Sequence, residues 1–292
     1  IGSDGKYSTL KSLQYFIQEN KEKVSTFTSP HLYDLRVSVI SQGQSVDTVD
    51  SYFGLRKIEV RHDGDASRLF LNGQMMFQIG VLDQGYWPDG LYTAPTDAAL
   101  RYDIETAKSL GYNLIRKHMK VEPERWYYWA DRLGILVWQD MPMGNNWGGW
   151  GQHTYKNELQ RMIDNLHNHP SIITWVIFNE RWGQFNAAGL AEMVKYLDPS
   201  RLVIGATGYA EQGVGDLVSF HSYQRVDFPQ VETDNPKVLA EWGGLGLPIV
   251  GHTWKSGSDG LRWAEPAHIE STHDGSHFLG RYQDYINQIR AL

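Results

Sequence analysis

The chain has 292 residues, a formal net charge of −7, no cysteine and an aromatic content of 13%. The acidic balance, without any cluster of Lys and Arg, argues against nucleic acid or an anionic membrane as partner, and the lack of cysteine excludes disulfides, thiolate nucleophiles and sulfur-ligated metals. No apolar run approaches the roughly 20 residues of a membrane helix, so a soluble protein is expected. Eleven Trp suit a protein that stacks against sugars, although a large core also holds Trp.

Residues up to about 60 have the pattern of antiparallel strands. Apolar and polar side chains alternate from Leu32 to Ile40, and Gly43 and Gln44 mark a turn before a second extended stretch. This pattern predicts the tail of a β-sandwich, followed by a short hinge over residues 61–74. Because the chain begins with Ile1, we expect a piece of a longer protein whose compartment, whether periplasmic, secreted or cytoplasmic, stays open.

From residue 76 onward, apolar strands alternate with amphipathic helices. Two of these helices end in Leu-Gly, at Gly111 and Gly134, which predicts the same glycine C-cap twice. Seven apolar strands in one such run favour a (β/α)8 TIM barrel that stops before its eighth strand, and no Gly-x-Gly-x-x-Gly supports a dinucleotide site. The expected strands are 76–81, 113–118, 135–140, 173–180, 202–207, 217–223 and 237–242, and the expected helices are 97–110, 123–133, 155–167, 190–197 and 277–292.

Polar side chains end nearly every predicted strand. In a parallel barrel the carboxyl ends of the strands converge on one face, where active sites are built. If each strand merely ended in solvent, the presence of such polar side chains at nearly every strand end would be a coincidence. The side chains are Asp83, Arg116, His118, Gln139, Asp140, Asn179, Glu180, His221, Tyr223, Glu241 and Trp242.

Two carboxylates stand out in this set, because Glu180 ends the apolar run NHPSIITWVIFNE and Glu241 ends KVLAEW. Two carboxyl groups that face each other can hydrolyse a glycosidic bond, one as acid/base and the other as nucleophile. Their repulsion would raise the pKa of one of them and keep it protonated. Asn179 can bind a substrate hydroxyl, and Tyr223 can hold an oxygen of the nucleophile.

The stretches NHPSIITWVIFNE, LDPSRLV, HSY and PKVLAEWGG resemble the catalytic domain of glycoside hydrolase family 2, which contains β-galactosidases, β-glucuronidases and β-mannosidases. NGQMMFQIGV matches the family's entry into the barrel, and SPHLYDLRV and SYFGLRKIEV resemble the end of its immunoglobulin-like sandwich. The resemblance implies a sandwich part at 1–62 and a catalytic barrel at 63–292, incomplete at its C-terminal end.

By this resemblance the protein is a retaining exo-β-glycosidase with Glu180 as acid/base and Glu241 as nucleophile. Tyr223 stands at the family's tyrosine on the sixth strand. The remaining strand-end residues are expected to bind the substrate, a glycoside or oligosaccharide: Asp83, Arg116, His118, Asp140, Asn179, His221, Tyr223 and Trp242.

Two departures from the family pattern leave the sugar open. The second strand reads RKHMKV instead of Arg-Thr-Ser-His-Tyr-Pro, so His118 comes one place early. The third strand reads WQDMPM, which is closer to a mannosidase-like Trp-Gln-Asp than to the galactosidase Asp-Glu-Ala-Asn, so we expect no metal and no cofactor. A β-galactosidase-like activity is the leading expectation, with β-glucuronidase or β-mannosidase activity as alternatives.

Other classes of function fit the same residues less well. A metal-dependent barrel hydrolase would need His-x-His at the first strand, where this chain has Gln78-Ile79-Gly80. A non-catalytic sugar-binding barrel would be expected to lose one carboxylate, and both are present. The linkage and the homo-oligomeric state have no readable signal in the sequence.

Overall fold

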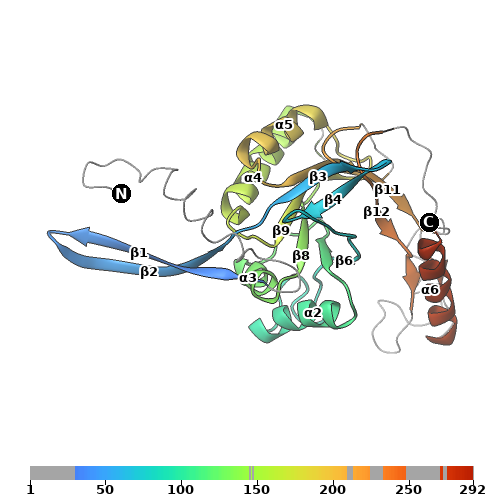
Figure 1. Ribbon diagram of the computed structural model, residues 1–292, viewed down its shortest axis with the longest axis horizontal. Helices are drawn as coiled ribbons and strands as arrows, with labels where there is room; N and C mark the ends of the chain where they lie inside the picture. The colour runs from blue at the N-terminus through green and yellow to red at the C-terminus, as the bar shows by residue number, and fades with distance from the viewer. Residues whose placement is uncertain are drawn as a thin grey trace.

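The computed structural model describes residues 30–144, 146, 148–208, 213–223, 233–247, 270–271 and 275–291. Within these ranges seven strands, joined in parallel pairs, follow one another in space in chain order. Five of them, β6, β8, β9, β11 and β12, are labelled in Figure 1. β6 to β10 form one hydrogen-bonded sheet, β11 pairs with β12, and the residues just before β11 bond to β10. The strands are β6 (Gly80–Asp83), β7 (Leu114–Lys117), β8 (Leu136–Asp140), β9 (Ile172–Asn179), β10 (Leu202–Thr207), β11 (Val218–Ser222) and β12 (Lys237–Trp242).

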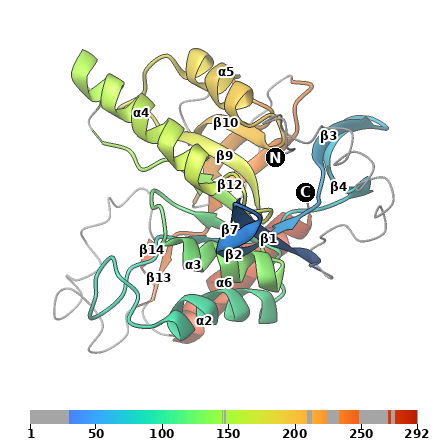
Figure 2. The same ribbon diagram turned by 90° about the vertical axis from the view of Figure 1, so that its left-hand side faces the viewer.

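Helices cover the outer face of this sheet. α2 packs beside α3, and α4 packs beside α5 on the side of β9 and β10 (Figure 2). The two predicted Leu-Gly caps are confirmed, since Gly111 and Gly134 both have the positive φ that favours glycine. None of the described helices has the length and hydropathy of a membrane span. The helices are α2 (Asp97–Ser109), α3 (Glu124–Leu133), α4 (Gly149–Leu166), α5 (Ala187–Leu197) and α6 (Gly275–Arg290).

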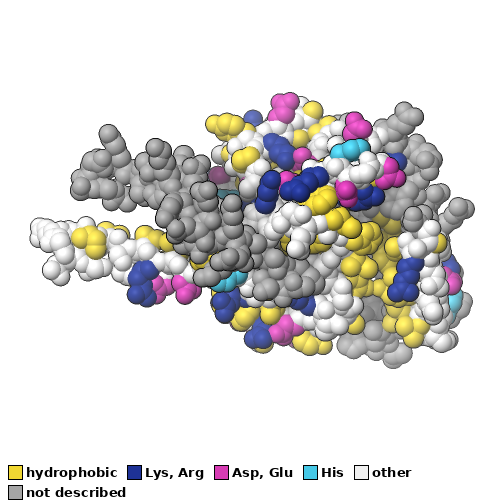
Figure 3. Space-filling model, in the orientation of Figure 1, with side chains coloured by type: hydrophobic (Ala, Val, Ile, Leu, Met, Phe, Trp, Pro, Cys, Tyr) yellow, Lys and Arg dark blue, Asp and Glu magenta, His cyan; other side chains and the backbone are white. Residues whose placement is uncertain are grey.

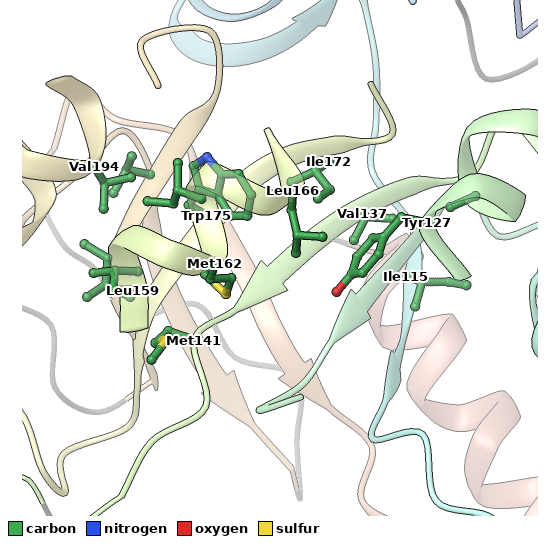
Figure 4. Packing of buried hydrophobic residues seen from close by; sticks show 14 of the residues in the cluster. Ile115, Tyr127, Val137, Met141, Leu159, Met162, Leu166, Ile172, Trp175 and Val194 are labelled. Atoms are coloured by element: carbon green, nitrogen blue, oxygen red, sulfur yellow. The ribbon is translucent and has the colours of Figure 1, made fainter. Parts of the chain in front are cut away.

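The larger hydrophobic core lies between the helices and the sheet. Leu159, Met162 and Leu166 of α4 point at Trp175 of β9, and Val194 of α5 lies beside them (Figure 4). Spacings of three and four residues place the α4 side chains on one helix face, which explains why this helix docks where it does. The core fixes the strands whose carboxyl ends carry the polar residues.

Residues 61–74 are not a hinge, so that prediction is wrong. β3 (Ile58–Asp63), β4 (Ala66–Leu71) and β5 (Gln74–Met75) form an antiparallel sheet. Ile58, Leu69 and Leu71 are buried against the first residues of the barrel strands, among them Leu114 and Leu136. The apolar face of this small sheet therefore closes the amino-terminal end of the barrel, opposite the strand ends that carry the chemistry.

The predicted hairpin before this sheet is present. β1 (Leu32–Ser41) and β2 (Gln44–Gly54) pair antiparallel and project from the rest of the molecule (Figure 1). Apolar side chains such as Val37 and Val49 are exposed along it (Figure 3). Residue 62 lies within β3, where His62 pairs with Ser67 of β4. The division of the chain at this residue into a sandwich part and a barrel stays a prediction.

The first barrel strand lies later than predicted, at Gly80–Asp83 instead of 76–81. The backbone N–H of Met76 still bonds to Leu69 in β4, and parallel pairing with β7 begins only at Gly80, opposite Leu114. Any side chain at residue 80 would lie within 2.8 Å of the Leu114 carbonyl oxygen, so glycine allows the two strands to approach.

Three helices also begin earlier than the pattern suggested: α4 at Gly149, α5 at Ala187 and α6 at Gly275. Within the described residues β6 pairs only with β7 and β12 pairs only with β11, and the absence of an eighth barrel strand stays a prediction.

Candidate active site

Arg116 lies at the centre of the strand-end residues and is buried. Its Nε and Nη2 donate to the two carboxylate oxygens of Asp140 at 3.1 and 2.9 Å, and its Nη1 donates to Glu241 Oε1 at 3.0 Å. Nη2 also donates to Asn179 Oδ1 at 2.9 Å and to Thr207 Oγ1 at 3.0 Å. These partners come from β8, β9, β10 and β12, so the row of strands curves until the end of β7 approaches the end of β12.

The two carboxylates around Arg116 compensate for its burial. Burial alone would lower the pKa of Arg116, but Asp140 and Glu241 hold that pKa above its ordinary value. The guanidinium therefore stays a cation, and its planar donors fix Asp140 through two parallel hydrogen bonds.

Glu241 is held on both of its oxygens. Oε1 accepts from Arg116, and Oε2 accepts from the hydroxyl of Tyr223, directly after β11. The side chain is 12% exposed, so a small part of it faces the open end of the barrel. A carboxylate held by two donors has little freedom to rotate, which suits a group that must meet a reacting carbon from one direction.

Glu180 is held differently. It has a positive φ of 55°, which is rare for a residue with a side chain, while its N–H donates to the Thr207 carbonyl at 2.9 Å. Its side chain is 31% exposed, the most open of the strand-end charges that meet here. This exposure distinguishes Glu180 from the buried side chains of β9 that precede it.

The two glutamates face each other. Side-chain atoms of Glu180, His221 and Glu241 that could bind a metal all lie within 4.8 Å of one another. Retaining glycosidases have carboxyl groups about 5–5.5 Å apart, whereas inverting enzymes have them about 6.5–9.5 Å apart. One oxygen of Glu180 thus lies within 4.8 Å of one oxygen of Glu241, an approach that is compatible with a retaining pair.

The same three side chains form the group in the described residues that could hold a metal ion. Tyr223 and Arg116 already donate to the two oxygens of Glu241. A cation bound there would compete with both donors, so the geometry gives a metal no clear advantage.

His118 reaches the site from β7 despite its early position in the sequence pattern. Its Nε2 lies 3.6 Å from Glu241 Oε1, and its Nδ1 lies 3.1 Å from the Gln84 amide nitrogen. Burial, aided by Arg116, holds the pKa of His118 below its ordinary value, against the opposing effect of Asp140 and Glu241. The imidazole is therefore neutral at neutral pH.

Asp83 does not join this group. Its carboxylate accepts from the buried ammonium of Lys117 and, at 2.7 Å, from the N–H of Gly85. Lys117 and Lys120 in turn bind the buried Glu122 at 2.9 and 3.0 Å. The carboxylate of Asp83 thus fixes the loop after β6, and its expected contact with substrate stays a prediction.

Trp242 is also placed differently from the expectation. Its ring stacks on Tyr282 at 6.0 Å and lies 6.3 Å from Tyr285, both in α6. Tyr285 donates to the backbone carbonyl of Tyr223. These contacts make Trp242 part of the packing that holds the ends of β11 and β12 in place, and its expected contact with a sugar stays a prediction.

Thr207 was missed by the sequence analysis. It is buried at the end of β10 and donates to Asn179 Oδ1 at 2.8 Å while it accepts from Arg116. A polar side chain at the end of the fifth apolar strand was the available signal, and it is weak because Thr is common in strands.

The family model of the glycosyl hydrolases family 2 TIM barrel domain matches residues 67–250. The chain belongs to glycoside hydrolase family 2. A putative β-glucuronidase of Formosa agariphila is 29% identical over 245 residues, and a β-galactosidase of Leuconostoc mesenteroides is 28% identical over 233 residues. Each alignment covers 74% of this chain, and the chain spans 29% and 21% of the length of these two relatives.

Solved structures of the family show the same fold. The β-glucuronidase of Parabacteroides merdae aligns with a TM-score of 0.60 at 25% identity over 68% of this chain and 26% of its own. A family 2 β-galacturonidase from Eisenbergiella tayi, solved with galacturonate, aligns with a TM-score of 0.71 at 21% identity over 92% of this chain and 50% of its own. Strands β6 to β12 with helices α2 to α5 thus form the TIM barrel of this family.

Proposed function

We propose that the protein is a retaining exo-β-glycosidase. Glu241 attacks the anomeric carbon while Glu180 protonates the leaving oxygen, and Glu180 then removes a proton from the water that hydrolyses the glycosyl-enzyme. The observation that carries this proposal is the close pair of carboxyl groups at the ends of β9 and β12.

The contacts of the two glutamates support these roles. Glu241, held by Arg116 and Tyr223, has the fixed orientation that a nucleophile needs. Glu180 is more exposed, as suits a group that exchanges protons with an aglycone and then with water. The amide oxygen of Asn179 accepts from Arg116 and Thr207, so a contact with a sugar hydroxyl would use its NH₂ group, which also lies near His118.

We take a β-galactoside as the first candidate substrate, as the sequence suggested. A β-glucuronide is the second candidate, because the Formosa relative is named a putative β-glucuronidase. The mannosidase-like Trp-Gln-Asp motif gives less guidance. Gln139 is buried, and its side chain bonds to Tyr127 and to the Lys120 carbonyl, while Asp140 binds Arg116. These two side chains therefore hold other site residues in place and do not indicate which sugar is bound.

A panel of p-nitrophenyl β-glycosides, tested on the full-length protein with Glu241→Gln as the control, examines this proposal. We expect turnover of the β-galactoside or the β-glucuronide, with the sugar released first as its β anomer, and no turnover by the variant. Sugar binding without turnover would favour a non-catalytic barrel. Release of the α anomer first would mean inversion.

A further inference from the structure

His221 lies between the two proposed catalytic carboxylates, yet its side chain is fully buried, with 0% exposed. Its Nδ1 lies 3.4 Å from Glu180 Oε1 and 3.6 Å from Glu241 Oε2. The hydroxyl of Tyr223 lies 3.4 Å from the same nitrogen. A side chain with no exposed surface cannot touch a sugar, so the substrate-binding role expected for His221 does not fit its position.

The imidazole of His221 packs directly against the backbone of Gly208. Gly208 follows β10 with a φ of +74°, and a Cβ built on it would lie 2.6 Å from His221 Nδ1. The preceding residue, Thr207, accepts the N–H of Glu180 with its carbonyl oxygen. A residue with a side chain at 208 would push the imidazole away from Glu180, so the positions of Gly208, His221 and Glu180 depend on one another.

The two glutamates do not need His221 equally. Glu241 is held on each oxygen by a stronger donor, Arg116 or Tyr223, at shorter distances than that to His221. Glu180 has the positive φ and the larger exposure, and the imidazole lies within hydrogen-bond distance of its Oε1. Restraint by the imidazole therefore matters more for the orientation of the Glu180 carboxyl.

We propose that His221 is a positioning residue that orients Glu180 toward the leaving-group oxygen. The inference rests on the proposed function, since it assigns His221 to the proton transfer in which Glu180 is the acid. Proton transfer matters most when the leaving group is a poor one, because a good leaving group departs without protonation. A residue that only filled space would impair all substrates alike.

The test compares kcat/KM for a 2,4-dinitrophenyl glycoside and for the methyl glycoside of the best sugar, with the full-length protein. His221→Phe keeps the volume but removes the imidazole nitrogen, and we expect a loss of about 10- to 100-fold on the methyl glycoside and of less than about 3-fold on the dinitrophenyl glycoside. His221→Asn places a polar group near the former Nδ1 and should restore part of the loss.

Gly208→Ala provides an independent variant, because it displaces the imidazole without removing it. It should give the same selective loss on the methyl glycoside. Ser219→Ala, a buried change two residues earlier on β11, is the matched control and should leave both rates near the wild-type values. Circular dichroism and thermal unfolding establish that each variant is folded.

The outcomes distinguish a failure of the role proposed for His221 from a failure of the proposed glycosidase function. Selective loss in His221→Phe or in Gly208→Ala supports the inference, and either variant suffices if the other does not fold. Equal losses on the two substrates, or no loss, would overturn it while leaving the glycosidase assignment intact. A wild-type protein that hydrolyses no glycoside would refute the proposed function and this inference with it.

Discussion

Arg116 shows most clearly why residue type matters in this site. A guanidinium offers five donors in one plane, and here they serve Asp140, Asn179, Thr207 and Glu241 at the same time. An ammonium at the same place could not bind Asp140 with two parallel hydrogen bonds and still reach Glu241.

Arg116→Lys should therefore lower kcat/KM by about 100-fold, because Glu241 would lose its fixed orientation. It should also lower the free energy of unfolding by about 3 kcal/mol, since buried carboxylates would be left without full pairing. Steady-state kinetics and urea unfolding measure the two effects. Arg101→Lys, in the exposed pair with Glu105 on α2, is the control, and an equally small effect at Arg116 would contradict this account.

His118 gives a prediction about pH. Burial, as the largest cause, holds its pKa in the folded protein below the ordinary value, while the unfolded chain takes up a proton below about pH 6.5. The unfolded state then binds more protons than the folded state, so the contribution of this residue to the free energy of unfolding falls as the pH decreases through that range.

Urea unfolding at pH 7.5 and pH 5.5 tests this. His118→Gln should show a smaller drop in unfolding free energy between the two pH values than the wild-type protein. His62→Gln, an exposed histidine on β3, should keep the wild-type drop. A larger drop in His118→Gln would mean that burial does not disfavour the imidazolium.

At the scale of the elements, the apolar strands and the helix caps could be predicted from the sequence because both depend on local patterns. Thr96 is the N-cap of α2, and its hydroxyl accepts from Ala99 N at 3.1 Å. What could not be predicted is the pairing partner of a segment. Residues 61–74 pair as a sheet, and Met76 bonds to β4 instead of β7, because the docking of apolar faces decides both outcomes.

Replacing Thr96 tests how much this N-cap contributes to stability. Thr96→Ala should lower the free energy of unfolding by about 1 kcal/mol, since the first turn of α2 loses a side-chain acceptor. Thr96→Ser keeps the hydroxyl and should stay close to wild type in the same urea titration. If both variants were equally stable, the hydrogen bond to Ala99 would contribute nothing.

At the scale of the whole molecule, the sequence predicted that strand ends would converge, and the convergence is real for Arg116, His118, Asp140, Asn179, Glu180, His221, Tyr223 and Glu241. The side chain of Asp83 instead binds Lys117, and the ring of Trp242 stacks on α6, so their contacts with substrate stay predictions. Both contacts join residues distant in the sequence, so strand position alone could not reveal them.

The contact of β7 with β12 is the feature of the whole fold on which the proposed chemistry depends. The proposed nucleophile is fixed by a residue 125 positions earlier in the chain. The site therefore exists only when the sheet has curved so that Arg116 and Glu241 meet.

The most direct test of the central claim is to trap the proposed nucleophile. Full-length protein would be treated with a 2-deoxy-2-fluoro glycosyl fluoride of the preferred sugar, which slows the second step, and the labelled peptide would be mapped by mass spectrometry. We predict one glycosyl group per chain, attached to Glu241, with Glu241→Gln unlabelled. Attachment to another residue, or an active enzyme that never becomes labelled, would contradict the assignment.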